Sequence, residues 1–191
     1  MSQPARQHFS FQEYVRLEES STVKHEFLDG LVWAMAGGSP DHAAVAVNVS
    51  TLLATQLRDR PCRVFGSDLR VRVKETGLGT YPDVSVVCGR LELDPDDPQG
   101  HTVTNPVLLV EVLSPSTDAY DRGEKLAHYK RIPSLQEVVL VAYDRRQLEV
   151  WRREGSGWIL DVAHGDQRAP LRSVSCELPL GEVYRDPLAA G

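Results

Sequence analysis

The chain has 191 residues, of which 41% are hydrophobic and 25% are charged, a composition typical of an ordinary soluble globular protein. Its formal net charge of −6 argues against a protein that coats nucleic acid, although it leaves room for one local basic patch. No apolar run is long enough to cross a bilayer, and residues 1–10 lack the apolar core of a signal peptide. We therefore expect a cytoplasmic protein that makes no membrane contact.

Two helices are predicted in the N-terminal part of the chain. Residues 9–19 have one apolar side at helical spacing, and Ser10 followed by Glu13 is typical of a capping box. The run Ser39-Pro40-Asp41 supplies an N-cap, a first-turn proline and a first-turn acid. This run predicts a second helix that continues to about Arg58.

Several strands follow from the hydrophobic pattern. The Asp29-Gly30 pair separates two apolar runs, which predicts a hairpin. Residues 63–74 alternate between apolar and charged side chains, which predicts one half-buried strand with a basic outer face. Three further runs are apolar almost throughout and predict strands buried on both faces: residues 82–88, 107–113 and 137–143.

The order of these elements favours an α/β fold in which helices flank a mixed central β-sheet. Residues 148–165 predict an antiparallel meander at the sheet edge, followed by one last strand and an irregular tail. Residues 89–106 are rich in Pro, Gly and Asp and predict a long surface loop. No linker or repeat divides the chain, so we expect a single domain over residues 9–187.

The cysteines carry little information at this stage. Cys62, Cys88 and Cys176 are far apart and odd in number. They match neither a disulfide framework nor a zinc cluster.

Carboxylates in or beside the buried strands are the first candidate functional residues. Glu111 lies within an apolar strand, where an ionised carboxylate is costly unless it is paired or coordinated. Asp83 opens the preceding buried strand, and successive strands tend to be neighbours, so both acids should lie on one side of the sheet. Such a pair suits Mg²⁺ or Mn²⁺. Glu26, on the first arm of the hairpin, would add a third carboxylate.

A lysine completes this set. The chain reverses at Ser114-Pro115, and the helix that follows should lie back across the sheet with Lys125 at the edge of its apolar side. From there the lysine arm can deliver its ammonium to the carboxylates. Tyr129, one turn later, is more simply explained by core packing, and His42 by packing against the hairpin, although His42 would lie behind the metal ligands if its helix points at the site.

Structural explanations compete for each of these residues. Lys125 would also fit an exposed helix position, paired with Asp121 four residues earlier. Glu26 would fit a solvent-facing position on the hairpin, and Asp83 a turn cap. A structural Glu111 would need a buried arginine or several backbone donors.

Five features give the chain a family resemblance: HEFLDG, the helix start Ser39-Pro40-Asp41-His42, YPDVSVV, LLVEVLSPST and DRGEKLAHYKRI. Pro82-Asp83 followed by Glu111 resembles the PD-(D/E)XK nuclease superfamily, and the five features together resemble its restriction endonuclease family often labelled Uma-two. The resemblance implies a restriction-endonuclease-like fold, a divalent-metal site and phosphodiester cleavage in DNA.

The resemblance also assigns roles to individual residues. Asp83 and Glu111 match the motif acids, and Glu26 matches the acid before the hairpin turn. The chain departs from the superfamily at Leu113, which stands where a lysine is usual, and Lys125 matches a lysine that has migrated to the following helix.

The leading hypothesis is thus a Mg²⁺-dependent endonuclease that acts on DNA as a homodimer. The rival is a catalytically inactive module of the same fold that binds nucleic acid or a protein, which Leu113 and the acidic net charge would favour. A third hypothesis, a metal-dependent hydrolase of small phosphate compounds, would need an enclosed pocket.

Overall fold

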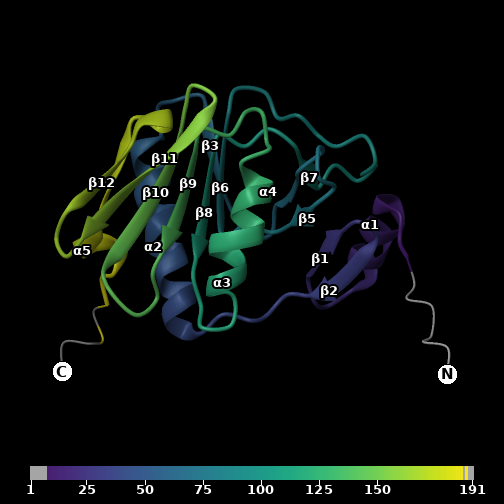
Figure 1. Ribbon diagram of the computed structural model, residues 1–191, viewed down its shortest axis with the longest axis horizontal. Coiled ribbons are helices and arrows are strands. Elements are labelled where there is room, and N and C mark those ends of the chain that lie inside the picture. The colour runs from purple at the N-terminus through teal and green to yellow at the C-terminus, as the bar shows by residue number, and fades with distance from the viewer. Residues whose placement is uncertain (1–7, 187, 189–191) are drawn as a thin grey trace.

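A six-stranded mixed sheet forms the centre of the molecule, in the order β11-β10-β9-β8-β6-β3 (Figure 1). The computed structural model describes residues 8–186 and 188, so the predicted domain limit Pro187 lies outside the described residues. Strands β8 and β9 are parallel, and the other neighbouring pairs of this sheet are antiparallel. The strands are β3 (Cys62–Gly66), β6 (Val84–Cys88), β8 (Leu108–Val112), β9 (Glu137–Val141), β10 (Gln147–Glu154) and β11 (Gly157–His164). The predicted mixed sheet and the C-terminal meander are confirmed.

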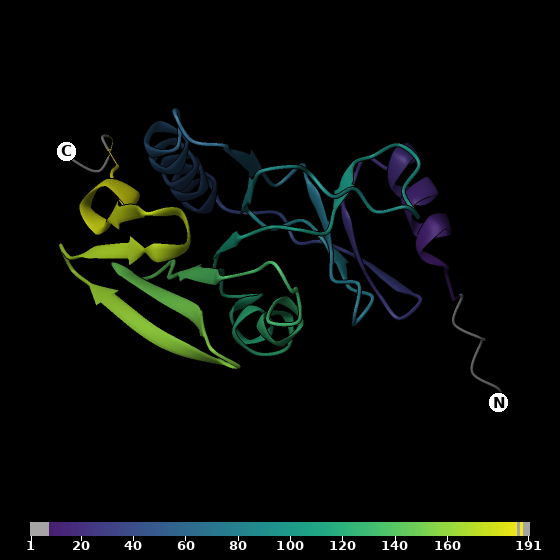
Figure 2. The same ribbon diagram turned by 90° about the horizontal axis from the view of Figure 1, so that it is seen from above.

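Each face of this sheet carries its own hydrophobic core. On one face pack helix α2 (Pro40–Gln56), strands β12 (Arg168–Leu171) and β13 (Cys176–Pro179), and α5 (Leu180–Val183). On the other face lies a helical segment of three parts, α3 (Asp118–Tyr120), the π-helical turn η1 (Asp121–Lys125) and α4 (Leu126–Tyr129) (Figure 2). Because side chains of β8 alternate between these two cores, the strand is apolar on both faces.

A second sheet stands beside the central one, towards the N-terminal end of the molecule (Figure 1). Its strand order is β2-β1-β5-β4-β7, and helix α1 (Phe11–Ser20) packs on β1 through an aromatic cluster. The strands are β1 (His25–Leu28), β2 (Leu31–Ala34), β4 (Arg70–Arg72), β5 (Gly79–Thr80) and β7 (Thr102–Val103). The capping box of Ser10 and Glu13 and the hairpin turn at Asp29-Gly30 are present as predicted.

The prediction of one strand over residues 63–74 is wrong. The chain forms β3 in the central sheet, turns at Ser67-Asp68, and continues as β4 in the second sheet. Because both pieces have a period of two, the pattern does not reveal the break between them.

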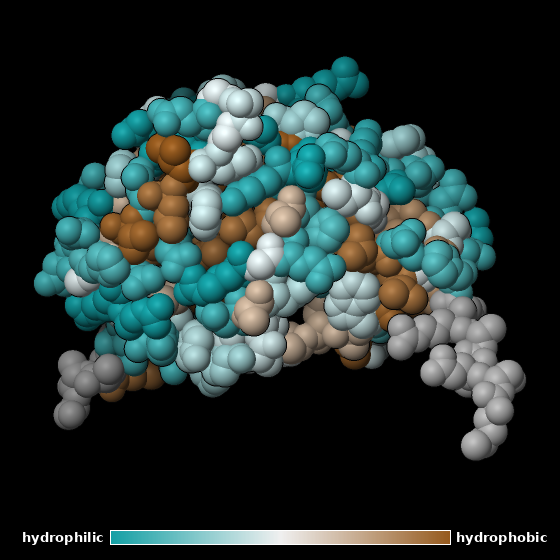
Figure 3. All heavy atoms as spheres, viewed as in Figure 1, coloured by the Kyte–Doolittle hydropathy of each residue, from teal (hydrophilic) through white to brown (hydrophobic). Residues whose placement is uncertain are grey.

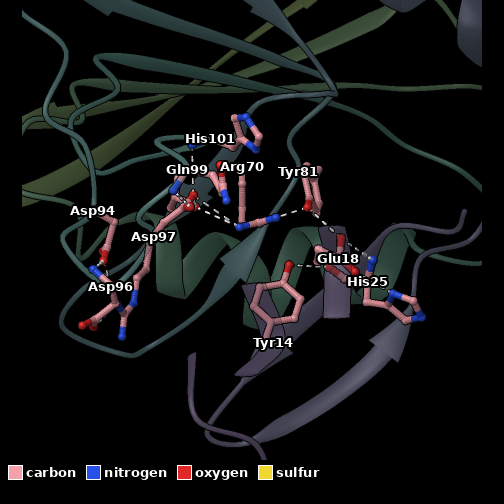
Figure 4. Close-up of polar contacts among 12 residues, drawn as sticks. Tyr14, Glu18, His25, Arg70, Tyr81, Asp94, Asp96, Asp97, Gln99 and His101 are labelled. Carbon is pink, nitrogen blue, oxygen red and sulfur yellow. Dashed lines mark hydrogen bonds and ion pairs between the residues drawn. The ribbon is translucent and has the colours of Figure 1, made fainter. Parts of the chain in front are cut away.

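The predicted basic outer face is wrong too, because the arginines of β4 are neutralised within the protein. Arg70 is 4% exposed; it donates to the Tyr81 hydroxyl at 2.9 Å and pairs with Asp97 at 3.5 Å (Figure 4). Arg72 pairs with Asp94 at 3.0 Å and with Asp96 at 2.7 Å. The segment 89–106 is therefore not a plain surface loop: it contains β7, and its buried Asp94 and Asp97 hold the arginines of the second sheet.

A disulfide joins Cys62 to Cys88, which corrects the expectation that the cysteines form no such bond. The antiparallel register of β3 and β6 places these two residues opposite each other, a relation that their separation of 26 residues does not reveal. Cys176 is buried and free.

Two smaller differences concern the ends of elements. Helix α2 ends at Gln56 rather than about Arg58, and the C-terminal part contains β12 and α5 in addition to the predicted last strand. Within the described part of the chain, no helix combines the length and apolar character that a membrane span requires.

Candidate active site

A pocket of about 310 Å³ opens at the end of β8 where the two sheets meet. Its walls come from β1, from the connecting segment 34–38 before α2, from the start of β6, and from the segment 114–125. The charged residues that line it are Glu26, Asp83, Glu111, Asp121 and Lys125, and His42 also reaches it. The pocket therefore gathers residues from segments that are far apart in the sequence.

Glu111 is held in the pocket by two donors. It is 5% exposed, and its Oε1 accepts a hydrogen bond of 2.5 Å from the Tyr129 hydroxyl. The Lys125 ammonium lies 3.0 Å from the same oxygen. Tyr129 is thus buried in the core, as predicted, and its hydroxyl also fixes the orientation of the carboxylate.

Lys125 is the centre of a cluster of three carboxylates. Its Nζ lies 3.0 Å from Glu111, 3.1 Å from Glu26 and 3.5 Å from Asp121. The side chain is buried, so the exposed-helix explanation of Lys125 is wrong, although the predicted pair with Asp121 exists. Glu26 is 3% exposed and accepts a 2.5 Å hydrogen bond from Thr80, so its solvent-facing explanation is wrong as well.

A π-helical turn carries Asp121 and Lys125 at its two ends, and both side chains point inward. Residues four positions apart lie near one face of a helix, so the two side chains can share a direction. Here the turn covers Asp121–Lys125 and leaves both ends buried, while Arg122 and Glu124 stay outside. Such turns often occur at functional sites.

Asp83 lies on the neighbouring strand end, across from Glu111. Strands β6 and β8 pair directly, which confirms the predicted adjacency. The Asp83 Oδ2 accepts a 2.8 Å hydrogen bond from the Val112 amide and lies 3.3 Å from the His42 Nε2. His42 thus reaches Asp83 from the N-terminal end of α2, and Asp83 caps the end of β8 rather than a turn of its own.

Burial and charge shift the protonation of this cluster. Burial, together with the nearby charge of Asp83, outweighs the effect of Lys125 and raises the pKa of Glu111 to about 8. Burial alone would lower the pKa of Lys125, but Glu111 and the other surrounding groups hold that pKa well above its usual value. The hydrogen bond to Asp83 raises the pKa of His42. The charged groups of the pocket are therefore arranged around the Lys125 ammonium.

The donor set fits a divalent ion held by few protein ligands. Both contacts of Glu111 use Oε1 and both contacts of Asp83 use Oδ2, so each carboxylate keeps a second oxygen that neither set of contacts occupies. Across residues 8–186 and 188, no three His, Cys, Asp or Glu side chains are arranged as a metal cage. A cation here would be held by Asp83 and Glu111, with water in its remaining positions, as Mg²⁺ allows.

The sequence analysis did not assign site roles to Asp121, Thr80 or Tyr120. The hydroxyl of Tyr120 is buried without a hydrogen bond. Burial raises the pKa of Tyr120, and the charge of the nearby Glu26 also raises it. Asp121 was visible only as a partner of Lys125, four residues away near one face of the same helix.

Comparison with known proteins agrees with this architecture. The family model described as "Putative restriction endonuclease" (Uma2) matches residues 11–181. The Synechocystis protein slr1290 is 37% identical over 176 residues, which cover 91% of this chain and 90% of slr1290. A second Synechocystis protein, sll1609, is 35% identical over 155 residues, or 81% and 86% of the two chains. Both are described as uncharacterized.

A solved structure shows the same fold. The crystal structure of a protein from Anabaena variabilis, described as a "putative nuclease belonging to DUF820", superposes with a TM-score of 0.74 at 18% identity. The match covers 92% of this chain and 97% of the other. The restriction-endonuclease-like fold implied by the sequence motifs is thereby confirmed, and the chain belongs to the Uma2 family of restriction-endonuclease-like proteins.

Proposed function

We propose that this pocket is the active centre of a divalent-metal-dependent endonuclease that hydrolyses phosphodiester bonds in DNA. The observation that carries the proposal is the convergence of Asp83, Glu111 and Lys125 on one pocket. Membership of a family described as restriction endonucleases supports a nuclease, and the two carboxylates with uncommitted oxygens support Mg²⁺ or Mn²⁺ as the cofactor.

The acids would hold the ion, and their neighbours would hold the acids. When bound, a divalent ion at Asp83 and Glu111 would polarise the phosphodiester and lower the pKa of a coordinated water. The Val112 amide and His42 orient Asp83, and Tyr129 orients Glu111. These partners act on the ligands and not on the substrate, and such outer contacts commonly tune a metal site.

Lys125 would supply the positive charge that the usual motif lysine supplies. Leu113, at the usual position, is fully buried in the core and has no polar group. The Lys125 ammonium reaches the Glu111 carboxylate from the helix that follows β8. Placed there, it can stabilise the negative charge that develops on the phosphate in the transition state. Glu26 and Asp121 would keep the ammonium charged and directed at the pocket.

The net charge of −6 favours a second candidate, an inactive module that binds nucleic acid or a protein. Both candidates use the same fold, and they differ in whether the pocket cuts. Cleavage of DNA therefore separates them.

The test is nicking of supercoiled plasmid in Mg²⁺ or Mn²⁺ by the wild type and by Glu111→Gln. We expect the variant to lose about 100-fold or more in rate, and chelation to abolish cleavage by the wild type. Glu75→Gln is the matched control, because Glu75 pairs with Arg131 on the surface, with 60% of its side chain exposed. A wild type that binds DNA but does not cut it in the presence of either Mg²⁺ or Mn²⁺ would support the inactive module.

A further inference from the structure

The crossing segment, residues 81–83, carries the proposed metal ligand Asp83 from the second sheet to the central sheet. Strand β5 of the second sheet ends at Thr80, and strand β6 of the central sheet begins at Val84. Residues 81–83 therefore belong to neither sheet, and Pro82 has no amide to donate. The position of the crossing segment consequently depends on the contacts of its side chains.

Open space borders the crossing segment. Tyr81 and Asp83 both line the active-site pocket of about 310 Å³, and both also line a second pocket of about 620 Å³ beside α2. The molecular face in Figure 3 is hollowed between the two sheets. Because neighbouring side chains do not enclose the crossing segment completely, hydrogen bonds are needed to hold it in one position.

The hydroxyl of Tyr81 anchors the crossing segment to the second sheet. Tyr81 is 6% exposed, and its hydroxyl accepts a 2.9 Å hydrogen bond from the Arg70 Nε and donates one of 2.7 Å to Glu18 (Figure 4). Both partners are buried and held in turn: Arg70 pairs with Asp97, and the Glu18 side chain, 4% exposed, lies 2.7 Å from the His25 Nδ1. Hydrogen bonds to charged groups are stronger than those between neutral groups. Two fixed charged residues thus hold this hydroxyl.

The residues on either side of Tyr81 contact the active-site pocket or its walls. Thr80 donates a 2.5 Å hydrogen bond to Glu26, and Asp83 accepts one of 2.8 Å from the Val112 amide. Only Pro82 separates Tyr81 from Asp83, and its ring restricts the backbone torsion φ. A displacement of Tyr81 would therefore be passed on to Asp83.

We propose that Tyr81 is a positioning residue for the metal site: its hydroxyl, held by Arg70 and Glu18, fixes the crossing segment so that Asp83 presents a carboxylate oxygen to a divalent ion. The inference rests on the proposed function and adds to it a residue that touches neither the ion nor the substrate. The alternative is that the Tyr81 hydroxyl stabilises the second sheet and has no effect on the ion.

The first test is the Mn²⁺ affinity of the full-length chain, measured by calorimetric titration for the wild type and for Tyr81→Phe. This substitution removes one oxygen atom and leaves the net charge unchanged, so a lower affinity reports the position of Asp83 and not a change of charge. We expect Tyr81→Phe to bind Mn²⁺ about 10-fold or more weakly than the wild type, as is common when a contact behind a metal ligand is lost.

Tyr184→Phe is the matched control. The Tyr184 hydroxyl also lies between polar partners, 2.8 Å from the carbonyl oxygens of both Ala142 and Gln147, but Tyr184 is not among the residues that line the pocket. We expect both variants to unfold at lower urea concentration than the wild type, and only Tyr81→Phe to lose affinity for Mn²⁺.

The second test keeps the Tyr81 hydroxyl and does not require Tyr81→Phe to fold. Glu18→Gln and Glu18→Leu both remove the same negative charge and the ion pair with His25. The glutamine oxygen can still accept the hydrogen bond from Tyr81, whereas leucine has no acceptor. We expect Glu18→Leu to bind Mn²⁺ more weakly than Glu18→Gln.

The outcomes separate this inference from the proposed function. A wild type that binds no Mn²⁺ would refute the proposed metal site, and the positioning role with it. If the wild type binds Mn²⁺ and a folded Tyr81→Phe binds it equally well, the positioning role alone is wrong. Equal affinities in the two Glu18 variants, or equal losses in Tyr81→Phe and Tyr184→Phe, would also overturn it.

Discussion

Lys125 is a buried cation whose charge is balanced inside the protein rather than by water. Three carboxylates lie within 3.5 Å of its ammonium. Removing one partner of a buried ionic group commonly costs about 3–5 kcal/mol, because the remaining charges lose their compensation. The cluster therefore links stability and function at one side chain.

We predict that Lys125→Ala loses DNA cleavage and keeps metal binding, because it removes a contact to the transition state and no ligand. The variant should also unfold more easily, since Glu111, Glu26 and Asp121 are left without their cation. Lys125→Arg should restore stability in part and remain impaired in cleavage, because a planar fork does not replace a compact ammonium. Single-turnover assays would measure DNA cleavage, and calorimetric Mg²⁺ titration would measure metal binding. Cleavage by Lys125→Ala at the wild-type rate would exclude the migrated lysine.

The pKa of Glu111 predicts how metal binding depends on pH. Its pKa is raised to about 8, so the carboxyl holds a proton near neutral pH and a cation must displace it. Mg²⁺ affinity should therefore rise as the pH increases through about 8, with release of a proton on binding. Titration in buffers of different ionisation enthalpy detects this proton. Glu111→Gln has no such proton, and a pH dependence unchanged in that variant would assign the effect to another group.

At the scale of elements, the π turn η1 decides where the site residues point. We predict that inserting one alanine after Gly123 rotates Lys125 by about 100° around the helix axis relative to Asp121. Either Asp121 or Lys125 then leaves the cluster, so cleavage should fall while the helical circular dichroism persists. Gly123→Ala is the matched control, because a Cβ at this position meets no atom within 4 Å. If the insertion variant cleaves as the wild type does, the turn does not position the site.

The elements that could be predicted from the sequence are those with a local signal. The capping box of Ser10, the helix start at Ser39 and the Asp29-Gly30 turn are each set by neighbouring residues, and all three are present. The break between β3 and β4 and the Cys62–Cys88 bond depend on which strands pair, and sheet register has no local signal.

The candidate site divides in the same way. Glu111 and Asp83 were recognisable because an acid in or beside a buried strand contradicts the surrounding pattern. The approach of Lys125 was predicted only as one of two alternatives, since the reach of a lysine depends on how its helix turns. The contact of Thr80 with Glu26 and the place of Tyr120 in the pocket depend on how distant segments pack, which only the tertiary structure reveals.

At the scale of the whole molecule, the pocket depends on how the two sheets meet. The second sheet supplies Glu26, which accepts a hydrogen bond from Thr80, and the central sheet supplies Glu111. The second sheet is itself held together by the buried network of Arg70 (Figure 4). A substitution in that network should therefore lower the stability of the protein.

We predict that Arg70→Met lowers the free energy of unfolding by about 3–5 kcal/mol, because it leaves Asp97 buried without its cation. Arg145→Met should change it by no more than about 1 kcal/mol, because Arg145 is exposed and pairs with its neighbour Asp144. Urea unfolding of the two variants measures the difference. Equal effects would mean that the arginine network does not stabilise the second sheet.

The central claim is that Asp83 and Glu111 hold a divalent ion beside Lys125. Anomalous diffraction from crystals grown with Mn²⁺ locates such an ion without reference to activity. We predict one peak bonded to a carboxylate oxygen of each acid, at about 2.0–2.3 Å as for hard cations of this size, and no peak at that position in Asp83→Ala. A peak elsewhere in the wild type, or none at saturating Mn²⁺, would contradict the assignment of this pocket as a metal-dependent nuclease centre.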